Sequence, residues 1–184
     1  MTDNRGQDRR ESHISIRGEK KSDEAMIYEI TTRAFAPMPF SDGNEQDLID
    51  RFRKSGALEI SLVAELEDAI VGQVTFTRAF AADGSPGWYA LGPVAVEPEL
   101  QGQRIGEELI EAGLAELRKR AAAGCILVGN PDYYRRFGFR GFPELRPERQ
   151  PAEFYQILPL DVAEPDVVIE FHPLFYADGD GGLD

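Results

Sequence analysis

Residues 94–107 form the segment VAVEPELQGQRIGE, in which an apolar run is followed by a polar turn and then by the beginning of a helical pattern. Apolar residues from Ile105 to Leu117 recur at the spacing of one helix face, and Gly124 follows as a helix-ending residue. This pattern predicts a helix over about residues 104–121, preceded by a buried strand. A strand, a turn and a long helix in succession indicate a fold that packs helices on a central sheet.

The turn between this strand and this helix has the features of an anion-binding site. The first backbone N–H groups of a helix have no partner within the helix, and the helix dipole is positive at that end. Gly102 and Gly106 allow the backbone to approach a ligand closely, so the turn can hold a diphosphate. The side chains of Gln101 and Arg104 could add donors. The alternative is an ordinary turn whose glycines serve packing, and the sequence has neither the P-loop nor the dinucleotide-binding glycine pattern.

A second motif lies about thirty residues further along the chain. Residues 129–139 form the segment GNPDYYRRFGF, which follows a short apolar run and predicts a short helix over residues 132–137. Tyr133 and Tyr134 are adjacent in it. Taken alone, the two tyrosines fit aromatic residues of the core or of an interface.

The remaining segments predict a mixed α/β (α+β) domain whose central sheet is mostly antiparallel. Pro93 cannot donate to a strand ladder, so we expect a bulge or a broken pairing there. Two more helices are expected at residues 23–35 and 44–54. The expected strands are residues 13–17, 58–65, 69–80, 88–96, 125–128, segments after 139, and 167–171.

The chain of 184 residues has the length of one domain, which we place at residues 13–175. Residues 1–12 are expected to be a disordered leader, and residues 176–184 a flexible acidic tail. No apolar run approaches the ~20 residues that cross a bilayer, and the first twelve residues lack the apolar core of a secretory signal. Cys125 is the single cysteine, which excludes an internal disulfide and fits a cytoplasmic protein.

The formal net charge is −13, which argues against nucleic acid or an anionic membrane as a partner. This charge could attract cationic molecules, although it could equally serve only to keep the protein in solution. His13 and His172 are the two histidines and lie far apart in the sequence, so neither a histidine-rich zinc site nor a Ser-His-Asp triad is supported.

Together, the two motifs resemble the signature of the GNAT superfamily of acetyltransferases, and within it the YhbS-like branch. That signature is Q/R-x-x-G-x-G/A after an apolar strand, followed later by Y-x-x-x-G-F. Here residues 101–106 are QGQRIG and residues 134–139 are YRRFGF. The resemblance covers about residues 13–175 and implies a single GNAT-like domain, with a splayed central sheet flanked by helices, that transfers an acetyl group from acetyl-CoA.

The resemblance also implies a role for each matching position. The pantetheine arm would pair with backbone groups of residues 94–96 where the sheet splays open, and the pyrophosphate would bind backbone N–H groups of residues 102–107. Tyr134 would be the catalytic residue, next to the thioester sulfur, and no metal ion is expected. The expected cofactor-binding residues are Val94, Ala95, Val96, Gln101, Gly102, Gln103, Arg104, Ile105, Gly106, Glu107 and Asn130.

One position departs from the signature, because Arg104 stands where the family has its middle glycine. We expect the anion site to persist if residue 104 has a helical φ. The general base is not identified from the sequence. Glu97 and Glu99 lie beside the site but fit solvated turn carboxylates, and Cys125 and His172 fit structural roles.

The resemblance implies that a small-molecule or peptide-borne primary amine attacks the thioester directly, and a homodimer is left open. The net charge favours a cationic acceptor over a neutral or anionic amine such as an amino acid. Two alternatives remain: a non-catalytic module of the same fold that binds or senses acyl-CoA, and an acyltransferase with another acyl donor or a hydroxyl acceptor.

Overall fold

The computed structural model describes residues 13–39, 41–161 and 164–177. The expected leader and residues 178–184 of the expected tail lie outside these ranges. The helices are α1 (Glu24–Phe35), α2 (Glu45–Ser55), α3 (Ile105–Lys119) and α4 (Pro131–Tyr134). The strands of the main sheet are β1 (Ile14–Gly18), β2 (Leu58–Leu66), β3 (Ala69–Arg78), β5 (Trp88–Val96), β6 (Gly124–Val128), β7 (Arg140–Gly141) and β8 (Tyr155–Pro159). Two further strands, β4 (Phe80–Ala81) and β9 (Ile169–Glu170), pair with each other in a small second sheet.

The main sheet has the order β1-β2-β3-β5-β6-β8-β7, and its pairs are antiparallel except for β5 with β6. The mixed fold and the order of the expected elements are therefore confirmed. Two strand predictions were wrong in extent. The segment expected at 69–80 breaks after Arg78, and the one expected at 167–171 forms a two-residue strand of the small sheet. Between β7 and β8 the chain is irregular apart from one 3-10 turn.

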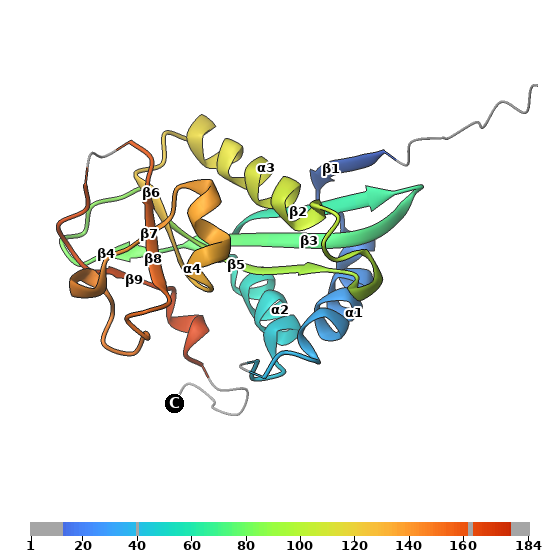
Figure 1. Cartoon of the computed structure of the whole chain (residues 1–184), viewed down its shortest axis with the longest axis horizontal. Coiled ribbons are helices and arrows are strands. Elements are labelled where there is room, and N and C mark those ends of the chain that lie inside the picture. Colours follow the sequence, from blue (N-terminus) through green and yellow to red (C-terminus); the bar gives the residue numbers. More distant parts are fainter. Residues whose placement is uncertain (1–12, 40, 162–163, 178–184) are drawn as a thin grey trace, which may run out of the picture.

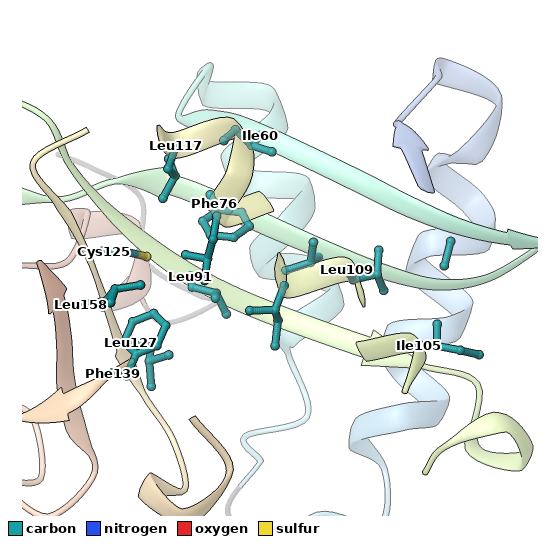
Figure 2. Packing of buried hydrophobic residues seen from close by; sticks show 14 of the residues in the cluster. Ile60, Phe76, Leu91, Ile105, Leu109, Leu117, Cys125, Leu127, Phe139 and Leu158 are labelled. Atoms are coloured by element: carbon teal, nitrogen blue, oxygen red, sulfur yellow. The ribbon is translucent and has the colours of Figure 1, made fainter. Parts of the chain in front are cut away.

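Helix α3 covers one face of the main sheet, and α1 and α2 cover the other (Figure 1). Strand β3 explains the separation, because Val74 and Phe76 point into the core beneath α3 while the intervening side chains point the other way. Figure 2 shows Ile105, Leu109 and Leu117 of α3 reaching toward the strands. This packing fixes the position of the first turn of α3 against the end of β5.

Gly113 sets how closely α3 approaches the sheet. A Cβ atom at this position would lie 2.1 Å from the ring of Phe76, so only glycine leaves room for the aromatic side chain. The close approach is consistent with a helix whose register against β3 is firmly determined.

Strands β5 and β6 separate after a short contact. Their parallel pairing involves only Trp88–Ala90 and Gly124–Ile126, whereas β5 remains paired with β3 as far as Val96. The second half of β5 therefore has an open edge on the side of β6. This is the splayed sheet that the resemblance implied.

Pro93 lies at the start of this open edge. The register of β5 against β3 shifts between Val74 and Phe76, opposite the proline, so the expected bulge is confirmed. The carbonyl of Pro93 accepts hydrogen bonds from Gln73 Nε2 at 3.4 Å and from Thr75 Oγ1 at 3.3 Å. Side chains of β3 thus supply hydrogen bonds to the carbonyl of Pro93.

The end of the described chain packs against α2. The side chain of Arg51 donates to the carbonyl of Ala177 at 2.6 Å, and the ring of Phe52 lies 4.8 Å from that of Phe175. Residues 176 and 177, placed in the tail by the sequence, therefore still contact the domain. Across residues 13–177, apart from the gaps stated above, no helix is long and apolar enough to span a membrane.

Candidate active site

The turn before α3 begins with a 3-10 helix at Pro98–Leu100 and ends with Arg104 as the residue before the helix. Gly102 has φ +78° and Arg104 has φ +69°, so both are in the left-handed region. The expectation of a helical φ at residue 104 was wrong. The backbone turns sharply there, which is why a glycine suits this position and why an arginine is strained in it.

The strained turn nevertheless leaves backbone donors without a partner among the described residues. None of the described residues accepts a hydrogen bond from the backbone N–H groups of residues 102–107, and the first bond of the helix runs from Glu108 N to Arg104 O at 3.0 Å. Six successive donors are therefore free at the positive end of a fifteen-residue helix. Such an arrangement is suited to a phosphate group.

We expect the substitution Arg104→Gly to raise the melting temperature by about 2–4 °C, because glycine adopts a left-handed φ without the strain that arginine carries. The exposed ion pair that Arg104 makes with Glu107 adds little to offset this gain. Thermal unfolding of the two proteins tests the expectation. The variant Arg104→Ala is the control, since it removes the same ion pair but keeps the strain, and it should not raise the melting temperature.

A cavity of about 350 Å³ opens at this turn. It extends from the open edge of β5 to the first turn of α3. Its lining residues are Met38, Val94, Val96, Leu100, Gln101, Gly102, Arg104, Ile105, Gly106, Glu107, Tyr133 and Arg136. The structure thus brings together most of the residues expected to bind the cofactor. Gln103 instead lines a separate depression with His13 and Glu108.

The open edge of β5 contributes backbone groups in an alternating pattern. Glu97 N donates to Val71 O at 2.9 Å. Because hydrogen-bonded and non-hydrogen-bonded residues alternate along an antiparallel pair, the backbone groups of Ala95 also bond to β3. Those of Val94 and Val96 point away from β3, toward the open edge. Of residues 94–96, only the two valines therefore offer backbone groups to the cavity.

Gln101 has a different contact from the one expected. Its side-chain Nε2 donates to the carbonyl of Val96 at 3.2 Å, so it ties the turn to the end of β5. The second N–H of the amide is left for another acceptor. Asn130 is similarly occupied, because its Oδ1 accepts from Asp132 N at 3.0 Å and caps α4.

Two residues that line the cavity, Tyr133 and Arg136, were not predicted from the sequence. Tyr133 was not among the expected site residues, but it is half-buried and lines the cavity, with its hydroxyl oxygen 3.5 Å from where a Cβ of Gly106 would be. Arg136 lies with its guanidinium 4.5 Å from the centre of the Tyr133 ring. The spacing of three residues on a helical segment is the signal that places Arg136 beside Tyr133.

Tyr134 packs against Tyr133 but does not itself line the cavity. Its ring packs against Phe137 and Phe139, and a Cβ at Gly129 would come within 2.4 Å of it. Burial raises the pKa of the Tyr134 hydroxyl, so the group stays protonated near neutral pH. None of the described residues is a hydrogen-bond partner of this hydroxyl.

The structure also limits the candidates for a general base. The carboxylate of Glu97 is engaged by Arg33, whose Nε lies 3.1 Å from it. Cys125 is fully buried, and burial raises the pKa of its thiol. His172 lies against Phe52 and Phe80 and does not line the cavity at the turn, and burial lowers its pKa. Within the described ranges, no three His, Cys, Asp or Glu side chains are placed to hold a metal ion.

Residues 25–139 match the model of the Acetyltransferase (GNAT) family, and the chain belongs to this family. The uncharacterized N-acetyltransferase YjhQ of Escherichia coli (strain K12) is 36% identical over 141 residues, which are 71% of this chain and 75% of YjhQ. The uncharacterized N-acetyltransferase YhbS of the same strain is 31% identical over 54% of this chain and 60% of YhbS.

Two crystal structures share the fold over most of both chains. A GNAT family acetyltransferase from Brucella melitensis, in complex with acetyl-CoA, is 37% identical with a TM-score of 0.79 and covers 89% of this chain and 99% of its own. YhbS from Escherichia coli, in complex with CoA, is 26% identical with a TM-score of 0.80 and covers 90% and 93%. The resemblance to the YhbS-like branch is thus confirmed.

Proposed function

We propose that this protein transfers the acetyl group of acetyl-CoA to a primary amine. The observation that carries the proposal is the set of free backbone N–H groups at residues 102–107, a segment that, apart from Gln103, lines the same cavity as the free edge of β5. A diphosphate suits the first feature, and the amide groups of a pantetheine arm suit the second. The complexes of the two related structures with acetyl-CoA and CoA support the assignment.

The reaction follows from the chemistry of a thioester. An alkylammonium has a pKa of ~10.4, so the amine first loses a proton to a base or through water. Its nitrogen then attacks the carbonyl carbon, and the developing oxyanion is stabilised by a backbone N–H group at the open edge of β5, for which Val94 is the candidate. The C–S bond breaks as Tyr134 donates its proton to the departing thiolate, and the proton that the new amide nitrogen loses returns through water to the Tyr134 oxygen.

The acceptor is proposed to be a cationic small molecule or a lysine-bearing peptide. The net charge of −13 attracts cations to the protein and repels phosphodiester backbones. Arg33 already neutralises Glu97, the carboxylate at the end of β5. The proposal of a cationic acceptor therefore rests on the net charge of the whole protein and not on a single carboxylate.

Release of free CoA from acetyl-CoA in the presence of amines tests the proposal. The panel should contain polyamines, lysine peptides, aminoglycosides and free amino acids, each at low and high salt. We expect turnover with a cationic amine, and kcat/KM should fall as salt shortens the screening length to about 8 Å near 0.15 M. Parallel melts should show stabilisation by roughly 2.7 kcal/mol when CoA is present at about 100 times its dissociation constant.

The outcomes separate the alternatives. Stabilisation by acetyl-CoA without turnover for any amine would favour a non-catalytic acyl-CoA-binding module. Turnover with alcohols or with longer acyl-CoA donors would move the activity to another acyltransferase class. No stabilisation by either CoA or acetyl-CoA would contradict the proposal as a whole.

A further inference from the structure

Glu107 carries a negative charge at the beginning of α3, where the phosphates of the proposed ligand would also lie. It is the third residue of α3 and lines the cavity, with 18% of its side chain exposed. A carboxylate at this position interacts favourably with the positive end of the helix. The phosphates of CoA would occupy the same end of the same helix, so the two anions would compete for it.

Two arginines bind the carboxylate, each at a different oxygen. Arg104 Nη2 lies 2.7 Å from Glu107 Oε1, and Arg136 Nη1 lies 3.5 Å from Glu107 Oε2. The hydrogen bond to Arg104 and the charges of both guanidinium groups keep the pKa of Glu107 below its usual range, so it is ionised at neutral pH. Both arginines also line the cavity.

The two guanidinium groups differ in how they are held. Arg136 stacks on the ring of Tyr133, and its Nε donates to the carbonyl of Tyr133 at 2.9 Å. Its terminal nitrogen Nη1 is directed at Glu107, which lines the cavity. Arg104 has a side chain that is 73% exposed, and Glu107 is its only charged partner within the described residues. Both groups line the same cavity, and a guanidinium binds a phosphate oxygen as well as it binds a carboxylate.

We propose that Glu107 is an internal counter-anion of the acyl-CoA site, which binds Arg104 and Arg136 when no phosphate is present and gives up both to the phosphates of the bound molecule. This inference rests on the proposed function and adds a regulatory feature to it. Because the carboxylate remains next to the phosphates after exchange, it lowers the affinity of the site for CoA and so favours release of that product.

Calorimetric titration of CoA into the wild type, Glu107→Gln and Glu108→Gln tests the inference. Glu108 is the matched control, because it lies in the same helical turn and carries the same charge but lines the separate depression beside His13. We expect Glu107→Gln to tighten CoA binding by about 3- to 10-fold at 0.01 M salt, and Glu108→Gln to do so by much less. The difference should shrink at 0.15 M salt, where the screening length falls from about 30 Å to about 8 Å.

Two further measurements identify the groups involved. S-Acetylpantetheine, which has no phosphate, should bind the wild type and Glu107→Gln equally. Arg136→Met should weaken CoA binding about 10-fold and do so more strongly in the Glu107→Gln background, where the guanidinium is free for the phosphate. Glu107→Ala serves as a second variant in case the glutamine disturbs the turn.

Weaker or unchanged CoA binding by both Glu107 variants would overturn the inference, as would an equal gain from Glu108→Gln. Tighter binding of S-acetylpantetheine by Glu107→Gln would also contradict it, since the effect would not involve phosphate. Failure of the wild type to bind CoA is a separate result, because it contradicts the proposed function itself.

Discussion

Replacing Gly106 by valine should weaken CoA binding by about 100-fold or more without unfolding the protein. A Cβ at this position would lie 3.5 Å from the Tyr133 hydroxyl and 3.7 Å from Val96 Cγ2, which are ordinary contact distances. Gly106 is helical and has no positive φ, so the fold accepts a side chain there. The two γ-methyl groups of valine, however, would extend into the cavity and keep a diphosphate from the backbone N–H groups around it.

Calorimetric titration with CoA, combined with thermal unfolding, separates these two effects. Gly18→Val is the control, because it adds the same side chain at a strand position with open space around it. Gly106→Ala should give an intermediate loss of affinity. An affinity for CoA that stays unchanged in Gly106→Val would show that this glycine serves packing only.

The second large effect is expected from Tyr134→Phe, which should lower kcat by about 10²–10³ while leaving the dissociation constant for CoA nearly unchanged. The substitution removes only the hydroxyl, so the packing of the ring against Phe137, Phe139 and the backbone at Gly129 remains. The lost proton donor acts on the thiolate, which exists only late in the reaction. Binding of CoA does not require that donor.

Tyr133→Phe is the matched control for Tyr134→Phe. The hydroxyl of Tyr133 lies next to Gly106 in the cavity, so its removal should raise the dissociation constant for CoA modestly and leave kcat nearly intact. Steady-state kinetics with a fixed amine give both parameters. Equal losses of kcat in the two variants, or no loss in Tyr134→Phe, would contradict the role proposed for Tyr134. Because burial raises the pKa of Tyr134, its ionisation should not limit the rate below about pH 10.

The order of helices and strands could be predicted because each follows from local patterns of apolar residues, glycines and prolines. The helix beginning at Ile105 and the bulge opposite Pro93 are examples. The left-handed φ of Arg104 could not be predicted in this way. Few residues other than glycine adopt that conformation, and here the turn between β5 and α3 imposes it.

Contacts between residues far apart in the sequence could not be predicted either. Glu107 and Arg136 are 29 residues apart in the sequence, and Arg33 and Glu97 are 64 residues apart. Neither pair has a local pattern that joins it, because the packing of α3, α4 and α1 around β5 brings the partners together. The short strands β4 and β9 were misjudged for the same reason, since each forms only through pairing with the other.

The short contact between β5 and β6 also leaves the backbone pairing across the sheet incomplete. The sheet has two parts, one formed by β1, β2, β3 and β5 and the other by β6, β8 and β7. Only three residue pairs, all at one end of β5, connect the two parts through backbone pairing. A molecule lying in the open end with amide groups facing Val94 and Val96 would take the place of an absent strand. The backbone ladder would then be complete only while this molecule is bound, so protection of these amides from hydrogen exchange would report directly on how much of the protein is loaded.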